Sequence, residues 1–241
     1  MILIYIFFVF AILIVAYRYS SKRIEFYGGY QKLWAHRVND FKKLKASQEK
    51  FPGIELDLVY NSNGNWLDIY HPPSKSKNIN LRDYIKKIHK NNLGVWLDIK
   101  NMDASNSDEI FTEINASLEN SFFKKENIII ESPNPYTLEK FHQNGFRTSY
   151  YLPQNLSRSN KHEIENIKEF LQKYPFLEIS TSYEDYQVLK KYFPTITKNF
   201  WILNSSYSID ILKNYKSIRE MVNDSTVKTL LTPYNNFNKY F

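Results

Sequence analysis

A histidine and an arginine stand side by side at the end of a short apolar run, LWAHR at residues 33–37. Histidine exchanges protons near neutral pH and arginine carries a fixed positive charge, so His36 and Arg37 could perform acid–base chemistry beside an anionic group. A second histidine, His71, ends another apolar run at residues 66–71. Either histidine alone would be typical of a hydrogen-bonded core residue. The prediction of chemistry therefore depends on which residues end the other apolar runs.

Three carboxylates and a lysine occupy these neighbouring runs. Glu55 and Asp57 are two residues apart in GIELDLVY, so in a strand their side chains point to the same face. Asp98 stands near the end of the run GVWLDIK, with Lys100 two residues later. Carboxylates that share one face are costly to bury unless a cation or base lies between them. Oxygen ligands suit Ca²⁺ or Mg²⁺, so Glu55, Asp57 and Asp98 form a predicted divalent-cation site.

Acid–base groups, a hard metal and fixed positive charge together favour phosphodiester cleavage. His36 and His71 are the predicted acid and base, and Arg37 and Lys100 are the predicted phosphate contacts. Two further polar residues could belong to the same pocket: Asn39, and Glu131 in the run IIIES.

An internal salt-bridge network is the alternative explanation for this cluster. Glu55 and Asp57 could pair with Lys100 and Arg37 and serve only the scaffold. The other three histidines, His89, His142 and His162, lie in helical patterns and are expected at the surface.

The elements that must position these residues alternate along the chain. Eight β-rich runs cover residues 32–37, 53–60, 94–100, 127–132, 148–153, 177–182, 200–205 and 227–233. Amphipathic helical patterns cover residues 40–50, 79–91, 105–120, 135–144, 159–173, 183–192 and 208–222. This alternation predicts an α/β fold, a (β/α)₈ TIM-type barrel. An open doubly wound sheet is the alternative, but no glycine-rich phosphate loop follows the first strand.

The candidate residues all fall at equivalent places in this predicted barrel. Active sites of such barrels lie at the C-terminal ends of the strands, where the candidates stand. The run WLDIY follows NSNGN, a turn signal that predicts a hairpin with the second strand. His71 ends this hairpin and should be carried to the same mouth.

The N-terminus predicts a membrane anchor. Residues 1–17 carry no charge, and Arg18, Lys22 and Arg23 follow them. No basic leading region or small-residue cleavage site is evident, which favours an uncleaved single-pass helix over a signal peptide; a buried core helix is the other alternative. We therefore expect an anchor with its basic flank at residues 1–23 and a barrel domain at residues 24–241. The basic flank favours a cytoplasmic position for the barrel.

Composition limits the remaining possibilities. A chain of 241 residues with 43% hydrophobic residues can form one large domain. The net charge is +7, but the lysines and arginines are scattered along the chain among 25 acidic residues and do not form one basic block. No nucleic-acid partner is therefore expected. The absence of cysteine excludes disulfides and thiolate metal sites.

The order of motifs resembles that of a known family. AHR, then ELD with a hairpin that ends in histidine, then LDIK, is similar to the glycerophosphodiester phosphodiesterases, which belong to the phospholipase-C-like phosphodiesterase superfamily of barrels. The resemblance implies that the two histidines act as acid and base, that the three acids hold a divalent metal, and that the arginine and lysine contact phosphate. It thus implies the same roles for His36, His71, Glu55, Asp57, Asp98, Arg37 and Lys100. It also implies a glycerophosphodiester or lysophospholipid-like substrate and a cyclic phosphate intermediate.

Several departures from that pattern resemble the menorin family, a related group of barrels. Val38 stands where the phosphodiesterases have glycine, a proline follows His71, and Asp98 replaces glutamate. HRVND, HPP and LDIK are similar to the menorin motifs, so we expect the closest relationship there. Menorin-type proteins are associated with adhesion and signalling. The alternative function is therefore a non-catalytic module that recognises an anionic ligand in the same pocket.

Overall fold

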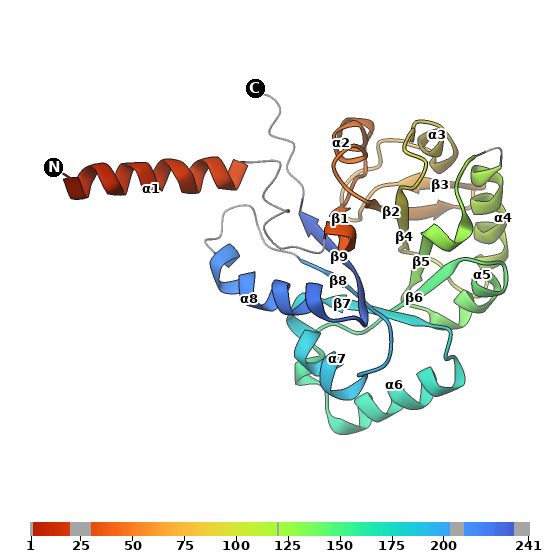
Figure 1. Cartoon of the computed structure of the whole chain (residues 1–241). Coiled ribbons are helices and arrows are strands. Elements are labelled where there is room, and N and C mark those ends of the chain that lie inside the picture. Colours follow the sequence, from red (N-terminus) through yellow and green to blue (C-terminus); the bar gives the residue numbers. More distant parts are fainter. Residues whose placement is uncertain (1, 20–29, 120, 203–209, 234–241) are drawn as a thin grey trace.

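The computed structural model describes residues 2–19, 30–119, 121–202 and 210–233. Eight parallel strands close into a barrel (Figure 1) because β1 pairs with both β2 and β9. The barrel strands are β1 (Leu33–His36), β2 (Gly53–Asn61), β4 (Gly94–Ile99), β5 (Ile128–Ser132), β6 (Arg147–Tyr151), β7 (Glu178–Ser182), β8 (Lys198–Trp201) and β9 (Val227–Pro233). The predicted barrel is confirmed.

The predicted hairpin is also present. The strand β3 (Trp66–Ile69) runs antiparallel to the second half of β2 and pairs with it from Leu58 to Asn61. Because β2 is longer than the other barrel strands, it carries β3 beyond the C-terminal mouth. The hairpin thereby brings His71 back to the mouth.

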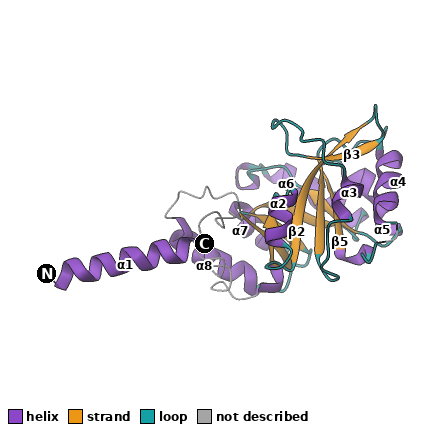
Figure 2. Ribbon diagram, turned by 90° about the horizontal axis from the view of Figure 1, so that it is seen from above, coloured by secondary structure: helices purple, strands orange, loops and turns teal. Residues whose placement is uncertain are grey.

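Helices surround the strands (Figure 2). They are α2 (Phe41–Ser47), α3 (Leu81–Ile85), α4 (Ser107–Leu118), α5 (Glu139–Gln143), α6 (Lys161–Lys173), α7 (Tyr186–Tyr192) and α8 (Asp210–Asn223), and short 3₁₀ turns cover Tyr30–Lys32, Lys125–Asn127, Pro135–Leu138, Leu156–Arg158 and Tyr183–Asp185. Side-chain caps begin several of them: Asp40 accepts from the backbone N–H of Lys43, and Asn160 forms a capping box with Glu163. These local signals explain why the helix positions could be predicted.

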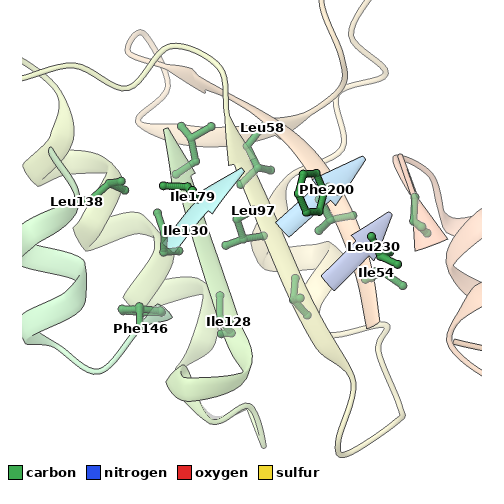
Figure 3. Close-up of a cluster of buried hydrophobic side chains, with 14 of the residues drawn as sticks. Ile54, Leu58, Leu97, Ile128, Ile130, Leu138, Phe146, Ile179, Phe200 and Leu230 are labelled. Carbon is green, nitrogen blue, oxygen red and sulfur yellow. The ribbon is translucent and has the colours of Figure 1, made fainter. Parts of the chain in front are cut away.

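Side chains alternate between the two faces of each strand, so the fold has one apolar core outside the barrel and another inside it. Outward-facing residues such as Leu97, Ile130 and Phe200 pack in the layer between the barrel and the helices (Figure 3). Inside the barrel, a smaller cluster consists of Trp34, Trp96, Ile129, Trp201 and Leu231. On the same inward faces, Asp98 follows Trp96 and Glu131 follows Ile129, so the polar residues come next along these strands.

Two glycines make room for the indole of Trp34. A Cβ on Gly53 would lie 2.2 Å from the Trp34 ring, and one on Gly94 would lie 2.4 Å from it. Both glycines begin their strands, so the indole closes the N-terminal end of the barrel. The opposite end is left for the polar residues.

The prediction of a membrane anchor is wrong. Residues 2–17 do belong to one helix, α1 (Ile2–Tyr19), which extends away from the barrel in both views (Figures 1 and 2). Within the part of the chain that the structure describes, however, no helix is both long and apolar enough to cross a membrane.

Without the anchor, the expected single-pass localisation in a membrane and the expected membrane partner have no support. The argument that the basic flank favours a cytoplasmic barrel also no longer applies. The expected boundary at residues 23 and 24 lies outside the described residues.

Candidate active site

The structure brings the nine candidate residues to the C-terminal mouth of the barrel. His36 is the last residue of β1, and Arg37 follows it. Strand register places Asp57 of β2 beside Asp98 of β4, and Asp98 beside Glu131 of β5. This convergence follows from parallel pairing, because equivalent positions of neighbouring strands lie at the same height.

The three predicted metal ligands lie close together. Glu55, Asp57 and Asp98 are buried, and each offers a carboxylate oxygen within 4.8 Å of the others. Oxygen ligands lie about 2.0–2.6 Å from Mg²⁺ or Ca²⁺, so oxygens on opposite sides of one ion are about 4–5 Å apart. The donor set and its spacing therefore fit a divalent cation.

The acidity of these carboxylates differs with their neighbours. Burial, together with the charges of Asp57 and Asp98, raises the pKa of Glu55 well above its ordinary value. Burial acts in the same direction on Asp57, but the Lys100 ammonium and hydrogen bonds from Lys100 and Asn39 outweigh it and lower the pKa of Asp57. Burial raises the pKa of Asp98 despite the contact with Lys100. Burial and mutual repulsion thus disfavour the ionised forms of Glu55 and Asp98 when no cation is bound.

Lys100 and Arg37 supply the positive charge. Lys100 Nζ lies 2.8 Å from Asp57 Oδ1 and also contacts Asp98 Oδ2. Arg37 Nε lies 4.0 Å from Asp57 Oδ2, and the Arg37 side chain is 43% exposed. The ion pairs expected if the cluster were only a salt-bridge network are therefore present. The Arg37 side chain nevertheless stays accessible from the mouth.

The two histidines occupy different environments. His36 is almost buried, with Nε2 3.8 Å from Glu55 Oε2, and burial, reinforced by Arg37, lowers the pKa of His36 to about 3. His36 is therefore neutral near pH 7. His71 is more exposed, and its Nε2 lies 2.9 Å from Arg37 Nη2. Because a guanidinium only donates, Nε2 accepts this bond and the His71 ring proton lies on Nδ1.

The two additional candidates also belong to the mouth. Asn39 Nδ2 donates to Asp57 Oδ2 at 2.6 Å. Glu131 is buried beside Asp98, and its Oε2 accepts a hydrogen bond from the Ser180 hydroxyl. Burial and the charge of Asp98 raise the pKa of Glu131 well above its ordinary value. The histidines expected at the surface, His89, His142 and His162, are indeed exposed.

Several residues of the mouth were not identified in the sequence. Tyr151 and Trp201 end β6 and β8, and their rings stack with centroids 4.8 Å apart on the arc opposite the carboxylates. The predicted strand runs 148–153 and 200–205 contain both residues but do not end at them, so only the structure places them at strand ends. The third residue, Ser180, lies in the middle of β7, where nothing in the sequence distinguishes it.

No family model matches the chain, and no curated protein matches it in sequence. Its fold is similar to those of solved phosphodiesterases. A glycerophosphodiester phosphodiesterase from Parabacteroides distasonis is 18% identical, with a TM-score of 0.58 over 83% of this chain and 92% of that one. One from Thermotoga maritima is 16% identical, with a TM-score of 0.54 over 83% and 93%.

A phosphodiesterase from Oleispira antarctica, solved in complex with the product sn-glycerol-3-phosphate, is 12% identical, with a TM-score of 0.58 over 83% of this chain and 92% of that one. At the level of fold, these similarities confirm the resemblance to the glycerophosphodiester phosphodiesterase-like barrels. The closer relationship to the menorin family stays a prediction.

Proposed function

We propose that this protein is a divalent-cation-dependent hydrolase of phosphodiester bonds that uses His36 and His71 as acid and base. The observation that carries the proposal is the convergence of three buried carboxylates, whose oxygens lie within 4.8 Å of one another, with both histidines at one barrel mouth. A scaffold does not require two histidines beside such a cluster. The similarity in fold to glycerophosphodiester phosphodiesterases supports the same reaction class.

Glu55, Asp57 and Asp98 would hold the cation, Ca²⁺ or Mg²⁺. When bound, it would act as a Lewis acid on the phosphoryl group. The repulsion between these carboxylates, which a cation would relieve, favours its binding.

Lys100 and Arg37 offset the charge of the phosphate. In the structure Lys100 Nζ lies between two of the proposed ligands, where it compensates their charge. With a cation held by the same carboxylates, the Lys100 ammonium would be free to contact the phosphate instead. Arg37 needs little rearrangement, because its guanidinium is already accessible.

The histidines move the protons. The neutral His36 ring accepts the proton of the attacking hydroxyl, from the substrate or from water, while a new P–O bond forms. His71, the more exposed of the two, gives a proton to the alcohol oxygen as its P–O bond breaks. It does so as an imidazolium, once Arg37 binds the phosphate and no longer donates to Nε2. His71 suits this role because the departing group must leave through the open side of the mouth.

The proposed substrate is a glycerophosphodiester or a lysophospholipid-like molecule. The similar fold solved with sn-glycerol-3-phosphate supports a glycerol-like alcohol. The partly exposed Tyr151 ring, stacked on the buried Trp201, offers an apolar surface opposite the phosphate contacts, suitable for the rest of the alcohol.

Turnover tests the proposal. The full-length protein is assayed with a panel of glycerophosphodiesters and lysophospholipids, with chelator or with millimolar Ca²⁺ or Mg²⁺. We expect cation-dependent hydrolysis that the double variant His36→Ala, His71→Ala loses, while His142→Ala, a surface control, retains it. Phosphate binding without hydrolysis of any substrate would favour the binding-module alternative instead.

A further inference from the structure

Asn39 makes two hydrogen bonds with Asp57 that run in opposite directions. Asn39 Nδ2 donates to Asp57 Oδ2 at 2.6 Å, and the backbone N–H of Asp57 donates to Asn39 Oδ1 at 3.0 Å. A carboxamide can donate and accept at the same time, whereas a carboxylate or an aliphatic side chain of the same size cannot. The contact is therefore specific to an amide at position 39.

The Asp57 carboxylate is held at both oxygens. Lys100 Nζ lies 2.8 Å from Oδ1, and Asn39 Nδ2 holds Oδ2. If a divalent cation displaces the ammonium, the Lys100 contact is lost. The Asn39 contact then remains to fix the plane of the carboxylate.

The loop that carries Asn39 is itself fixed by β2 and α3. The backbone N–H of Arg37 donates to Glu55 Oε2 at 2.5 Å, and that of Val38 donates to the Glu55 carbonyl at 2.9 Å. The buried Tyr84 hydroxyl donates to the Val38 carbonyl. Arg37 has a φ of 54°, a left-handed conformation that non-glycine residues rarely adopt and that persists only where surrounding contacts enforce it.

Two alternate residues of the loop thus hold two alternate residues of β2. The Arg37 backbone N–H binds the Glu55 side chain, and the Asn39 side chain binds the Asp57 side chain. We propose that Asn39 is a positioning residue that orients Asp57 for a divalent cation before the ion binds. This inference rests on the metal site of the proposed function. A ligand held in its binding orientation loses less conformational freedom when the ion arrives, so binding is tighter.

The test is calorimetric titration of the full-length metal-free protein with Ca²⁺ and Mg²⁺. We expect Asn39→Ala to weaken the affinity about 10- to 100-fold, the usual effect of removing a residue that orients a metal ligand. The matched control is Asn115→Ala, which removes an amide that donates to the Phe111 carbonyl on α4, away from the mouth. It should bind the ion as the parent does.

Melting curves separate positioning from a merely structural role. Positioning predicts that Asn39→Ala has a smaller cation-induced rise in Tm than the parent. An unchanged Kd, with equal losses of Tm in the presence and absence of the ion, would overturn the inference while the metal site stands. A parent that binds neither ion would overturn the metal site of the proposed function as well. Asn39→Ser replaces Asn39→Ala if the latter does not fold, since one hydroxyl cannot maintain both hydrogen bonds.

Discussion

The carboxylates of the mouth have different neighbours, and these neighbours decide which negative charges the folded protein accommodates. Asp57 has a close cation in Lys100, which lowers its pKa despite burial. Glu55 is equally buried but lies beside two other acids, so its pKa is raised. Removing a charge from these two residues should therefore have opposite effects on the metal-free protein.

Glu55→Gln should raise the Tm of the metal-free protein, because it removes an acid whose ionised form is disfavoured by burial and by its neighbours, and it keeps an acceptor for the Arg37 N–H. Asp57→Asn should lower stability by about 3 kcal/mol, because it leaves Lys100 with a weaker partner in a buried setting. Millimolar Ca²⁺ or Mg²⁺ should raise the Tm of the parent, and both variants should respond less. Melting curves with chelator and with each cation measure all three effects. A parent without any cation response would contradict the metal site.

His36 should make the metal-free protein sensitive to acid. Its pKa is about 3 in the folded state, whereas an unfolded histidine titrates near about 6.5. Between these values the unfolded chain binds the additional proton, so stability rises with pH through this range and is lost on acidification. From pH 7 to pH 5 this group should cost about 2 kcal/mol.

The pH dependence is measured by chemical denaturation of parent and His36→Asn at the two pH values. On acidification from pH 7 to pH 5, the variant should lose about 2 kcal/mol less stability than the parent. An equal loss in both proteins would mean that His36 titrates normally.

At the scale of elements, the first residues of strands determine how the barrel closes below the site. Trp34 on β1 lies over Gly53 of β2 and Gly94 of β4, and neither neighbour can carry a Cβ without moving the indole. The two glycines thus couple three strands that also carry the candidate residues at their other ends.

Gly53→Ala or Gly94→Ala should destabilise the protein by about 1–3 kcal/mol, the usual cost of overpacking a core. The comparison is Gly64→Ala in the hairpin turn, where the added Cβ would lie 2.6 Å from Trp66, whose side chain is partly exposed and can move aside more easily than the buried Trp34. Urea denaturation measures the change, and adding Trp34→Leu to Gly53→Ala should recover part of the loss. Additive effects of the two substitutions would contradict a clash between these residues.

At the scale of the whole molecule, the barrel and α1 differ in whether their apolar side chains are buried. Within the barrel, apolar side chains are buried on both sides of the strands. On α1 the large apolar side chains between Ile2 and Leu13 are exposed. The described part of α1 therefore contributes little packing to the barrel.

A chain that begins at residue 24 should consequently fold with nearly the same Tm as the full-length protein and keep the same Ca²⁺ affinity. Circular dichroism melting and calorimetric titration of both chains provide the comparison. A large loss of Tm on truncation would show that the barrel depends on the N-terminal residues.

Strand positions, helix positions and the barrel were predictable because they depend on local patterns: apolar runs such as GIELDLVY, caps such as Asn160, and the alternation of the two element types. The convergence of His36, Asp57 and Asp98 was predictable for a related reason. Parallel pairing brings the ends of neighbouring strands together, whatever residues follow them.

Only the tertiary structure decided which of these residues contact one another. Asn39 bonds to Asp57 across 18 residues, and Ser180 bonds to Glu131 across 49, because strand register and the course of the loops place them together. Whether Lys100 pairs with Asp57 or remains free depends in the same way on side-chain geometry across strands. The N-terminal segment also required the structure: the apolar run predicted a helix, which is present, but no described helix is long and apolar enough to cross a membrane.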